Sequence, residues 1–596
     1  MKILLVKPYN VSDHIQPSQG LGYLATAVRK THEVKILDCI KEGVTAQKFA
    51  RIIRRERPDV VGIQCYTFDL KFVDETLKAV KGQSAETVTM VGGPHPSAAP
   101  MEMMEHFATT LDYLFVGEAE VGLPRLLTAL QEGRKDLSNI PGLVYRKDGM
   151  VTKNQQLFVD DLDSLGIPAW DLIRPETFPE SQHGAFFKKF PIAPIIVTRG
   201  CPYSCTFCAG CVVSGKRVRR RSAGHVLSEI SYLYHDFGIR EFHVIDDNFT
   251  MDPLYAKDLL RQLKELRLDI SWAVPNGVRM DTLDDELLAL MKETGLYMIS
   301  LGIESGSDRI LKAMKKGITT AKVRECVARI HRAGIEMSGF FILGFPGETE
   351  ETMRQTIEFS LELPLSRANF FTYLPFPGSE SYAQLQERGE LAEVDWHHFY
   401  FMNAAYTPQG MTRQTLKRLQ QTAFAKFYLR PRIFLYHIRS IQSPRHLFFL
   451  SRRVFRWFTL GSMKRIVFMT VFAIWITLWA SFIARELFRK GYFYDYAALA
   501  TRSLEGKRSY VTGDTFYEFI TYCQKTLPEG VAYRWEGVEE GSLAKRRATY
   551  YLYPHLERED ADYYLVYESP EFSAYGYNIF ACLDETRYIM KREGGR

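Results

Sequence analysis

The chain has 596 residues, of which 46% are apolar and 24% are charged. This length corresponds to several domains, and the composition excludes intrinsic disorder and coiled coil as the dominant class. A net charge of +6 is too small to indicate nucleic-acid binding by the whole protein, and nine cysteines are too few for a disulfide-stabilised scaffold.

Residues 1–135 alternate short apolar, β-branched runs with helix-like stretches. The runs KILLVKPY, EVKILDC, VVGIQCY, VTMVGG and YLFVG are typical of buried strands, and the alternation predicts a doubly wound, Rossmann-like parallel sheet. In such sheets a ligand binds outside the carboxyl ends of the strands. At these ends the chain carries Pro8, Tyr9, Gln64, Tyr66, Thr67, Gly92, Gly93, His95, Gly117 and Glu118.

Residues 136–190 have the pattern of a connector, with a hairpin (GLVYRKDGMVTKN) followed by a proline-punctuated stretch. A second alternating series then fills residues 191–400, with six strand-like runs from APIIVTRG to ANFFTYLPF. This series predicts a complete or partial β/α barrel.

Four cysteines fall within eleven residues near the start of this series: Cys201, Cys205, Cys208 and Cys211. The first three, in a loop just after a strand, can ligate three irons of a four-iron cluster, because thiolates are the usual cluster ligands. One iron would then stay open for a substrate or cofactor. A zinc site would need four ligands, and Cys211 could supply the fourth. If the site is a cluster, Cys211 is an ordinary cysteine near it, a catalytic acid, or an alternative ligand.

From Trp396 to Arg485 the chain has no Asp or Glu but fourteen Lys or Arg. In residues 401–463 the arginines are interleaved with Phe, Leu, Trp and Tyr, which predicts a basic amphipathic helical region. Such a region suits an anionic lipid surface better than RNA, since no RNA-recognition motif accompanies it.

Residues 466–484 carry no charge and have about the length that crosses a bilayer core, which predicts a transmembrane helix over 464–486. The excess of basic residues before this segment predicts a membrane-anchored protein whose catalytic domains lie in the cytoplasm. Residues 487–596 would then form a small α+β domain outside, with a role that cannot be read. Cys523 and Cys582 lie in this part, where an oxidising compartment would permit a disulfide.

The segment TRGCPYSCTFCAG around the three cysteines resembles the cluster loop of radical S-adenosylmethionine (SAM) enzymes. Three later segments are also similar to that family: HVIDDNFT (243–250), NGVRMD with SLGIESGS (276–307), and GFFILGFPGE (339–348). The resemblance covers about residues 1–450. It implies a [4Fe-4S] cluster on Cys201, Cys205 and Cys208, and SAM contacts from Phe207, Asp246, Asp247, Asn248, Arg279, Glu304, Ser305 and Gly344.

The Asp-Asp-Asn-Phe-Thr form of the second motif departs from the commoner Gly-Gly-Glu pattern and is associated with the branch that carries an N-terminal cobalamin domain. The resemblance therefore implies that residues 1–135 bind cobalamin at the strand ends named above. The Asp-x-His-x-x-Gly pattern of many cobalamin proteins is absent, since Asp13 and His14 are adjacent and out of register. We expect no histidine on cobalt; Tyr66 or a neighbour would face that side, and His95 is either a further contact or structural.

The resemblance implies reductive cleavage of SAM with an electron from a flavodoxin- or ferredoxin-type donor. The leading hypothesis is a cobalamin-dependent enzyme that C-methylates an unactivated carbon of a small-molecule, lipid or membrane-associated substrate. Three alternatives stay open: a cobalamin-dependent radical cyclase or rearrangement enzyme, a radical SAM RNA-modifying enzyme, and a membrane-tethered sensor. Apart from the RNA alternative, no nucleic-acid partner is expected.

Overall fold

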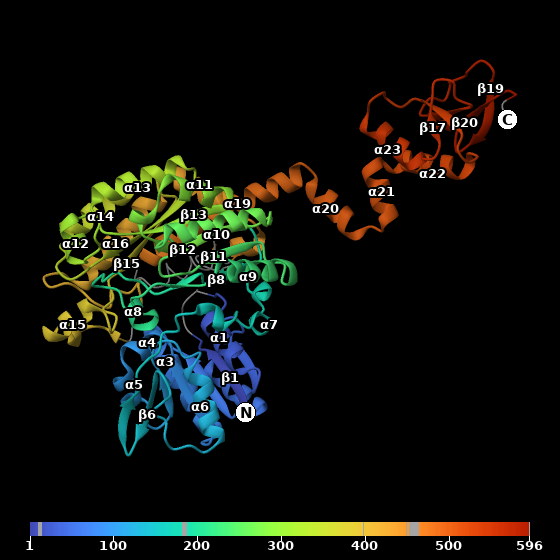
Figure 1. Ribbon diagram of the computed structural model, residues 1–596. Helices are drawn as coiled ribbons and strands as arrows, with labels where there is room; N and C mark the ends of the chain where they lie inside the picture. Colours follow the sequence, from blue (N-terminus) through green and yellow to red (C-terminus); the bar gives the residue numbers. More distant parts are fainter. Residues whose placement is uncertain (10–14, 181–186, 397–398, 449, 452–463, 595–596) are drawn as a thin grey trace. The chain divides into compact units, whose positions relative to one another are not determined.

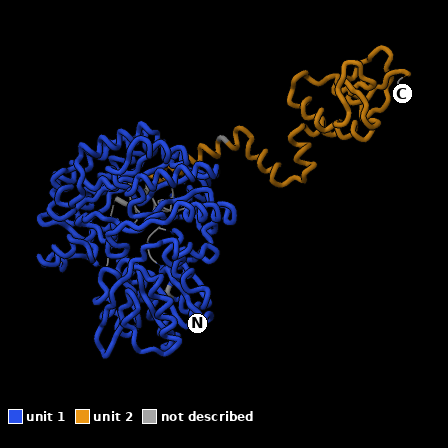
Figure 2. Tube along the Cα trace, in the orientation of Figure 1, with its two compact units in different colours: residues 1–456 blue, residues 457–596 orange. Residues whose placement is uncertain are grey.

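The structure is a computed structural model that describes residues 1–594 except 10–14, 181–186, 397–398, 449 and 452–463 (Figure 1). The side chains of residues 46, 393, 464–471 and 486 also lie outside the description. The chain divides into two compact units, residues 1–456 and residues 457–596 (Figure 2).

The first sheet has seven strands in the order β2-β1-β3-β4-β5-β6-β7. The first five are parallel, and the last two form an antiparallel hairpin at one edge. The strands are β1 (Lys2–Lys7), β2 (Glu33–Asp38), β3 (Val60–Gln64), β4 (Val88–Gly92), β5 (Tyr113–Phe115), β6 (Leu143–Lys147) and β7 (Met150–Lys153). The helices are α1 (Gln19–Val28), α2 (Ala46–Glu56), α3 (Leu70–Gln83), α4 (Pro94–Ala98), α5 (Pro100–His106) and α6 (Gly122–Gln131).

Alternate residues of β1 enter two separate hydrophobic clusters, Leu4 and Val6 on one face and Ile3 and Leu5 on the other. Both faces of the sheet are therefore covered, as expected of a doubly wound fold. The sheet continues past the predicted boundary at residue 135, because the hairpin assigned to a connector supplies β6 and β7.

The second sheet has six parallel strands in the order β15-β14-β13-β12-β11-β8. Because β8 and β15 remain edges, the sheet is a partial barrel (Figure 1). Its strands are β8 (Ile192–Ile195), β11 (Glu241–Val244), β12 (Ser271–Val278), β13 (Leu296–Glu304), β14 (Glu336–Leu343) and β15 (Arg367–Thr372). A small ladder pairs β9 (Thr198–Arg199) with β10 (Arg219–Arg220).

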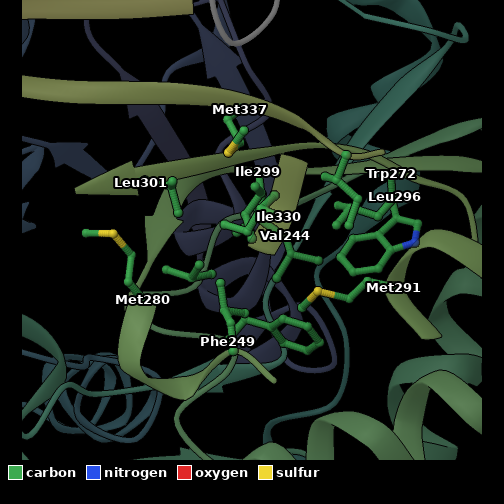
Figure 3. Close-up of a cluster of buried hydrophobic side chains, with 14 of the residues drawn as sticks. Val244, Phe249, Trp272, Met280, Met291, Leu296, Ile299, Leu301, Ile330 and Met337 are labelled. Carbon is green, nitrogen blue, oxygen red and sulfur yellow. The ribbon is translucent and has the colours of Figure 1, made fainter. Parts of the chain in front are cut away.

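The helices that follow in this unit are α7 (Trp170–Ile173), α8 (Gly210–Ser214), α9 (Ala223–Asp236), α10 (Pro253–Glu265), α11 (Asp285–Glu293), α12 (Asp308–Ala313), α13 (Thr320–Arg332), α14 (Glu350–Glu362), α15 (Glu380–Glu387), α16 (Arg413–Tyr428) and α17 (Pro431–Arg439). Helices α9, α10, α11, α13, α14 and α16 pack on the outside of the partial barrel, whereas α8 contacts α4 of the first domain. The core lies between helices and sheet, where Ile299 and Leu301 of β13 meet Ile330 of α13 (Figure 3).

The inner face of the sheet, which points away from these helices, is only partly covered along β14 and β15. On β14, Phe341 and Leu343 are buried in the core, whereas Phe340 and Ile342 are only partly buried. Phe371 on β15 is also partly buried, and its ring stacks with that of Phe340. In a filled barrel these inward-facing residues would be buried. Phe340, Ile342 and Phe371 thus keep part of their side-chain surface exposed on the inner face of the sheet.

In the predicted basic region over 401–463, residues 401–412 are irregular, and the helices begin with α16. α16 packs Leu416, Leu419, Ala423 and Phe427 into the barrel core, and α17 follows it. Residues 449 and 452–463 of this region lie outside the described residues.

The prediction of a transmembrane helix over 464–486 is not supported by the structure. A helix, α19 (Lys464–Arg489), does cover this segment. However, among the residues described, no helix is both long enough and apolar enough to cross a membrane. The uncharged run with described side chains, 472–484, is shorter than the about 20 residues that a bilayer core requires.

The end of the chain folds as an α+β domain, as predicted. Its sheet has the order β17-β16-β18-β20-β19. Its elements, after α20 (Tyr492–Thr501), are α21 (Leu504–Thr512), α22 (Asp514–Thr526), β16 (Ala532–Glu536), α23 (Leu543–Leu552), β17 (Leu556–Glu557), β18 (Tyr563–Tyr567), β19 (Tyr577–Cys582) and β20 (Arg587–Arg592). Cys523 is buried in the core and Cys582 is exposed, so the disulfide considered for them is not formed.

Candidate active site

The cysteine loop leaves β8 through β9 and reaches α8. Gly200, which precedes Cys201, has a φ of +98°, and a Cβ there would lie 2.2 Å from the Arg217 carbonyl oxygen. Glycine is therefore required at this position. The Cys201 N–H donates to the Gly215 carbonyl (3.1 Å), which ties the start of the loop to the chain just before β10.

The three thiols are close enough for the charge on one to change the pKa of another. Burial raises the pKa of the Cys201 thiol, and negative charge on Cys205 raises it further. The Cys208 thiol shows the same effect, with contributions from both other cysteines, although the Cys208 residue is open to solvent. A cation or cluster that neutralised these charges would favour the thiolates.

The chemistry of the three thiols suits an iron–sulfur cluster, because thiolates are its usual protein ligands. Thiolates of a four-iron cluster bind separate irons and do not need to converge on one point. Cys201, Cys205 and Cys208 therefore fit a [4Fe-4S] cluster, and Cys211 lies on α8 beyond the loop.

Asp246 follows β11 and supports the cysteine loop. Its carboxylate accepts hydrogen bonds from the Val197 N–H (2.8 Å), the Thr198 N–H (2.7 Å) and the Thr198 hydroxyl (2.7 Å). Burial raises the pKa of Asp246 to about 7. Because these bonds hold both oxygens, Asp246 positions the loop rather than offering free oxygens to SAM.

The other residues of this motif differ in their accessibility. Asp247 is exposed, and its carboxylate accepts a hydrogen bond from the Ser214 hydroxyl on α8 (2.6 Å). Asn248 is buried beside Thr250 and Met251. Of the three predicted contacts in this motif, Asp247 is thus the one whose side chain faces open space next to the cluster loop.

Two cations lie beside the cysteine loop. The Arg279 guanidinium lies 3.8 Å from the centre of the Tyr203 ring and donates to the Lys316 carbonyl (2.6 Å). Lys316 donates to Glu304 (2.8 Å), and its Nζ lies 5.8 Å from the centre of the Phe207 ring. Burial would lower the pKa of Lys316, but the Glu304 carboxylate outweighs this effect, and the pKa is raised.

Glu304 and its surroundings are constrained by close packing. Glu304 has a φ of +63°, and a Cβ on Gly302 would come within 2.6 Å of the Glu304 carboxylate and 2.7 Å of the Lys316 Nζ. Gly302 therefore leaves room for this ion pair at the carboxyl end of β13. Ser305, predicted as a SAM contact, is instead buried and bonded to Thr356 on α14.

The loop after β14 is held by a buried glutamate. Gly344 has a φ of +83°, and its N–H, together with that of Phe345, donates to the Glu348 carboxylate (2.7 and 3.0 Å). Burial raises the pKa of Glu348 to about 8. Gly344 thus presents backbone at the predicted adenine side, with Glu348 fixing its shape.

The strand ends of the first sheet also present backbone. Gly93 has a φ of +115°, and a Cβ there would lie 3.0 Å from the Cys65 carbonyl oxygen, so glycine is required where β4 turns into α4. His95 on α4 bonds through Nδ1 to the Thr67 hydroxyl (3.1 Å), and burial lowers the pKa of His95 to about 4. His95 is therefore a neutral, internally bonded side chain, which favours the structural interpretation.

The remaining predicted cobalamin contacts lie at the same edge with different accessibility. Tyr66 is exposed and stacks on Phe68, with the ring centres 5.4 Å apart. Tyr9 packs edge-on against Phe72, and Gln64 accepts a hydrogen bond from Ser18. Pro8 is buried after β1, and Gly92 ends β4. Asp13 and His14 lie outside the described residues.

The carboxyl edge of the first sheet faces the cysteine loop. Helices α4 and α8 lie side by side in Figure 1 and are in contact. A Cβ on Gly117, after β5, would lie 3.6 Å from the Val213 carbonyl oxygen of α8. Gly378, after β15, would place a Cβ 2.8 Å from Val212 and 3.2 Å from Ala98. A cofactor on this edge would therefore sit next to the cluster loop.

Two ion pairs hold the carboxyl edge of the first sheet against the chain around the cysteine loop. Glu118, predicted as a cobalamin contact, is bound instead by both terminal nitrogens of Arg219 (2.7 and 2.6 Å), and the pair is buried. Arg199, two residues before Cys201, donates to Glu120 (2.8 Å) and stacks on Tyr23. Glu118 thus joins the two domains, and its acceptor oxygens are already used.

The sequence interpretation missed Lys316, Tyr203 and the arginines of the domain interface. Lys316 stands in a lysine pair after α12, and such pairs are usually solvated. Arg199 and Arg219 become recognisable only when the fold brings them to Glu118 and Glu120, which are distant in sequence.

Two family descriptions match this chain: the B12 binding domain over residues 10–127 and the Radical SAM superfamily over residues 195–360. A relative from Pyrococcus horikoshii, the uncharacterized methyltransferase PH0819, is 32% identical over 442 residues, which cover 73% of this chain and 94% of the relative. The chain belongs to the cobalamin-dependent radical SAM methyltransferase family.

A second relative gives a similar match. The cytidylyl-2-hydroxyethylphosphonate methyltransferase of Streptomyces wedmorensis is 30% identical over 411 residues, covering 61% of this chain and 76% of the relative. Among solved structures, the cobalamin-dependent SAM radical enzyme OxsB, with aqua-cobalamin and SAM bound, has a TM-score of 0.59 at 17% identity. That match covers 80% of this chain and 75% of OxsB, and it shows a shared fold.

As a cobalamin-dependent radical SAM enzyme, the protein uses a [4Fe-4S] cluster, SAM and cobalamin. The residues present fit all three cofactors. Three neighbouring thiols are available for the cluster. The carboxyl ends of β12–β14 carry Arg279, Glu304 and Gly344, the residues that would contact SAM, and the glycine-rich strand ends of the first sheet would leave backbone accessible to cobalamin.

Proposed function

We propose that this enzyme C-methylates an unactivated carbon of a lipid or membrane-associated substrate. The observation that carries the proposal is the contact between α4, at the predicted cobalamin edge, and α8, which ends the cluster loop. This contact supports a methyl donor and a radical-generating site that open onto one shared substrate space.

The chemistry divides between the cofactors and the chain. When bound, the cluster supplies the electron that cleaves SAM, and cobalamin supplies methyl-group transfer. One SAM then leaves as S-adenosylhomocysteine, while another leaves as methionine and 5′-deoxyadenosine, which carries the hydrogen removed from the substrate carbon. The chain itself fixes the loop through Asp246 and places Arg279 and Lys316 beside the thiolates.

The partly exposed apolar side chains on the inner face of the second sheet support an apolar substrate. Phe340, Ile342 and Phe371 are partly buried there, and the Phe371 ring lies 5.0 Å from that of Phe401, measured between ring centres. Phe340 also lies near Gly277 at the carboxyl end of β12, where an added Cβ would be 3.6 Å from the Phe340 ring. An apolar group bound against this aromatic surface would reach the SAM side of the barrel.

Two further parts of the proposal concern the surroundings of the enzyme. No disulfide joins any of the nine cysteines, all of which are among the described residues, and this supports a reducing compartment such as the cytoplasm for the catalytic domains. Cys208 is exposed, which supports access to the cluster by a flavodoxin- or ferredoxin-type electron donor.

The test is an anaerobic assay of reconstituted enzyme with cobalamin, SAM, a low-potential reductant and a membrane-lipid extract. We expect both 5′-deoxyadenosine and S-adenosylhomocysteine, with the second rising only when extract is present. Deoxyadenosine without S-adenosylhomocysteine would favour a cyclase or rearrangement enzyme. Methylation confined to a soluble peptide, a nucleoside or RNA would contradict the lipid substrate.

A further inference from the structure

Helix α17 has one face fixed to the barrel. Ile433 is buried in the core, the Tyr436 hydroxyl donates to the Glu336 carboxylate at the start of β14, and the His437 ring packs 5.4 Å from the ring of Tyr428, measured between centres. These three residues follow the i, i+3, i+4 spacing of one helix face. Helix α17 is therefore anchored at the amino end of β14, away from the carboxyl ends that carry the cluster loop.

The opposite side of the helix is apolar and exposed. Phe434, Leu435 and Ile438 are 48%, 49% and 45% exposed, and Arg432 and Arg439 are exposed beside them. We call these five residues the α17 outer face. Single exposed hydrophobic residues are ordinary, but three large ones on one helix face indicate a binding surface.

The charge of this face and of its segment is positive. Neither Arg432 nor Arg439 pairs with a carboxylate within the residues that the structure describes. The sequence contains no Asp or Glu between Trp396 and Arg485, and the short segment after α17 adds exposed Arg445, Leu447 and Phe448. A partner that covers this region must accept both apolar side chains and arginines.

An anionic bilayer surface meets both requirements. Helices that lie in the membrane interface insert apolar side chains at the acyl boundary and direct arginines to anionic headgroups. RNA fits less well, because stacking on bases needs aromatic rings, and the α17 outer face offers only Phe434 among two aliphatic residues. We propose that the α17 outer face docks the enzyme on an anionic lipid bilayer, with α17 parallel to the membrane plane.

This arrangement goes beyond the proposed function and does not depend on it. Docking through α17 uses the amino end of β14 and leaves the exposed Cys208 at the other end of the barrel accessible. Because vesicle binding is measured without turnover, failure of lipid methylation and failure of docking are distinguishable.

The test uses the full chain in co-sedimentation with two kinds of vesicle, phosphatidylcholine alone and phosphatidylcholine mixed with phosphatidylglycerol. We expect binding to the anionic vesicles that weakens as salt is added, because salt screens the arginine contribution. Equal binding to both kinds of vesicle at all salt concentrations would contradict the role of the arginines.

Two double variants test the surface itself. Leu435→Ser with Ile438→Ser should weaken anionic-vesicle binding about tenfold, since two large side chains lose their apolar burial. Arg432→Glu with Arg439→Glu should abolish the part of anionic-vesicle binding that weakens as salt is added. The apolar variant is matched by Leu254→Ser with Leu266→Ser, two exposed leucines in α10 and directly after it. The charge variant is matched by Lys48→Glu with Arg51→Glu on α2. Both control variants should bind anionic vesicles as the wild type does.

Unchanged circular dichroism and iron content would show that the variants are folded. Wild-type vesicle binding by both α17 double variants would overturn the proposal and assign any membrane contact to another part of the chain. Binding of RNA that is lost in the α17 variants, without binding to anionic vesicles, would also overturn it.

Discussion

Lys316 and Glu304 form a buried ion pair beside the cluster loop, where a charge without a partner is costly. The pair distance is 2.8 Å, and the side chains are 12% and 9% exposed. Removing one partner of such a pair leaves the other charge buried and unpaired, whereas replacing both partners is far less destabilising. The pair therefore combines a structural role with its position next to Cys205.

We predict that Lys316→Met lowers the free energy of unfolding by about 3–5 kcal/mol, because Glu304 loses its counter-charge. The double variant Lys316→Met with Glu304→Gln should recover much of this loss. Chemical denaturation of all three proteins measures both quantities. A single variant as stable as the wild type would show that the pair is solvated.

The carboxyl of Glu348 makes stability depend on pH. Its pKa is raised from 4.5 to about 8 in the folded protein, so the folded state holds a proton that the unfolded state has released. Its stabilising contribution is complete below 4.5 and is lost as pH rises toward 8, with a slope of at most about 1.4 kcal/mol per pH unit. We predict that Glu348→Gln makes the free energy of unfolding fall less steeply between pH 4.5 and about 8, as measured by chemical denaturation. Parallel pH profiles for the wild type and the variant would contradict this prediction.

The cluster cysteines, Arg279, Glu304 and Gly344 belong to short motifs, and their roles as cofactor contacts stay predictions. Asp246, Ser305 and Glu118 are also predicted as cofactor contacts, and in the structure their side chains hold loops or join domains. Their partners are distant in sequence, and a motif cannot reveal whether an oxygen is already bonded.

At the scale of single elements, the cluster loop depends on one glycine. Gly200 allows the loop to pass close to residue 217, and it sets the position of Cys201. The elements around the loop were predictable, since buried parallel strands appear as continuous apolar runs. The hairpin β6–β7 was placed outside the sheet because a hairpin pattern does not reveal which edge it joins.

We predict that Gly200→Ala lowers the iron and sulfide content of the reconstituted enzyme severalfold, because the added Cβ would collide with the Arg217 carbonyl oxygen. Gly224→Ala on α9 is the matched control, since a Cβ there meets nothing within 4 Å. Full iron occupancy in the Gly200 variant would show that the loop has room to adjust.

At the scale of the whole first unit, buried ion pairs hold the cobalamin domain against the barrel. Arg219 on β10 binds Glu118 after β5 with two hydrogen bonds, and both side chains are almost inaccessible to solvent. Apolar patterning predicted the two domains separately. It could not predict their contact, because interfaces made of Arg and Glu have no periodic signal.

We predict that Arg219→Gln loosens this interface, costing about 3–5 kcal/mol and weakening cobalamin retention on gel filtration, because Glu118 stays buried without its partner. Arg220→Gln, the exposed neighbour on the same strand, should retain cobalamin as the wild type does. Equal cobalamin retention by the two variants would show that the Arg219–Glu118 pair does not contribute to cobalamin binding.

The proposed function requires that the cobalamin edge and the cluster loop face each other across one substrate space. Pulsed electron paramagnetic resonance on enzyme that holds a reduced cluster and cob(II)alamin tests it directly, because the coupling between the two spins depends on their separation. The contact between α4 and α8 predicts a resolved dipolar coupling. Two independent, uncoupled spin signals from fully loaded enzyme would contradict the account.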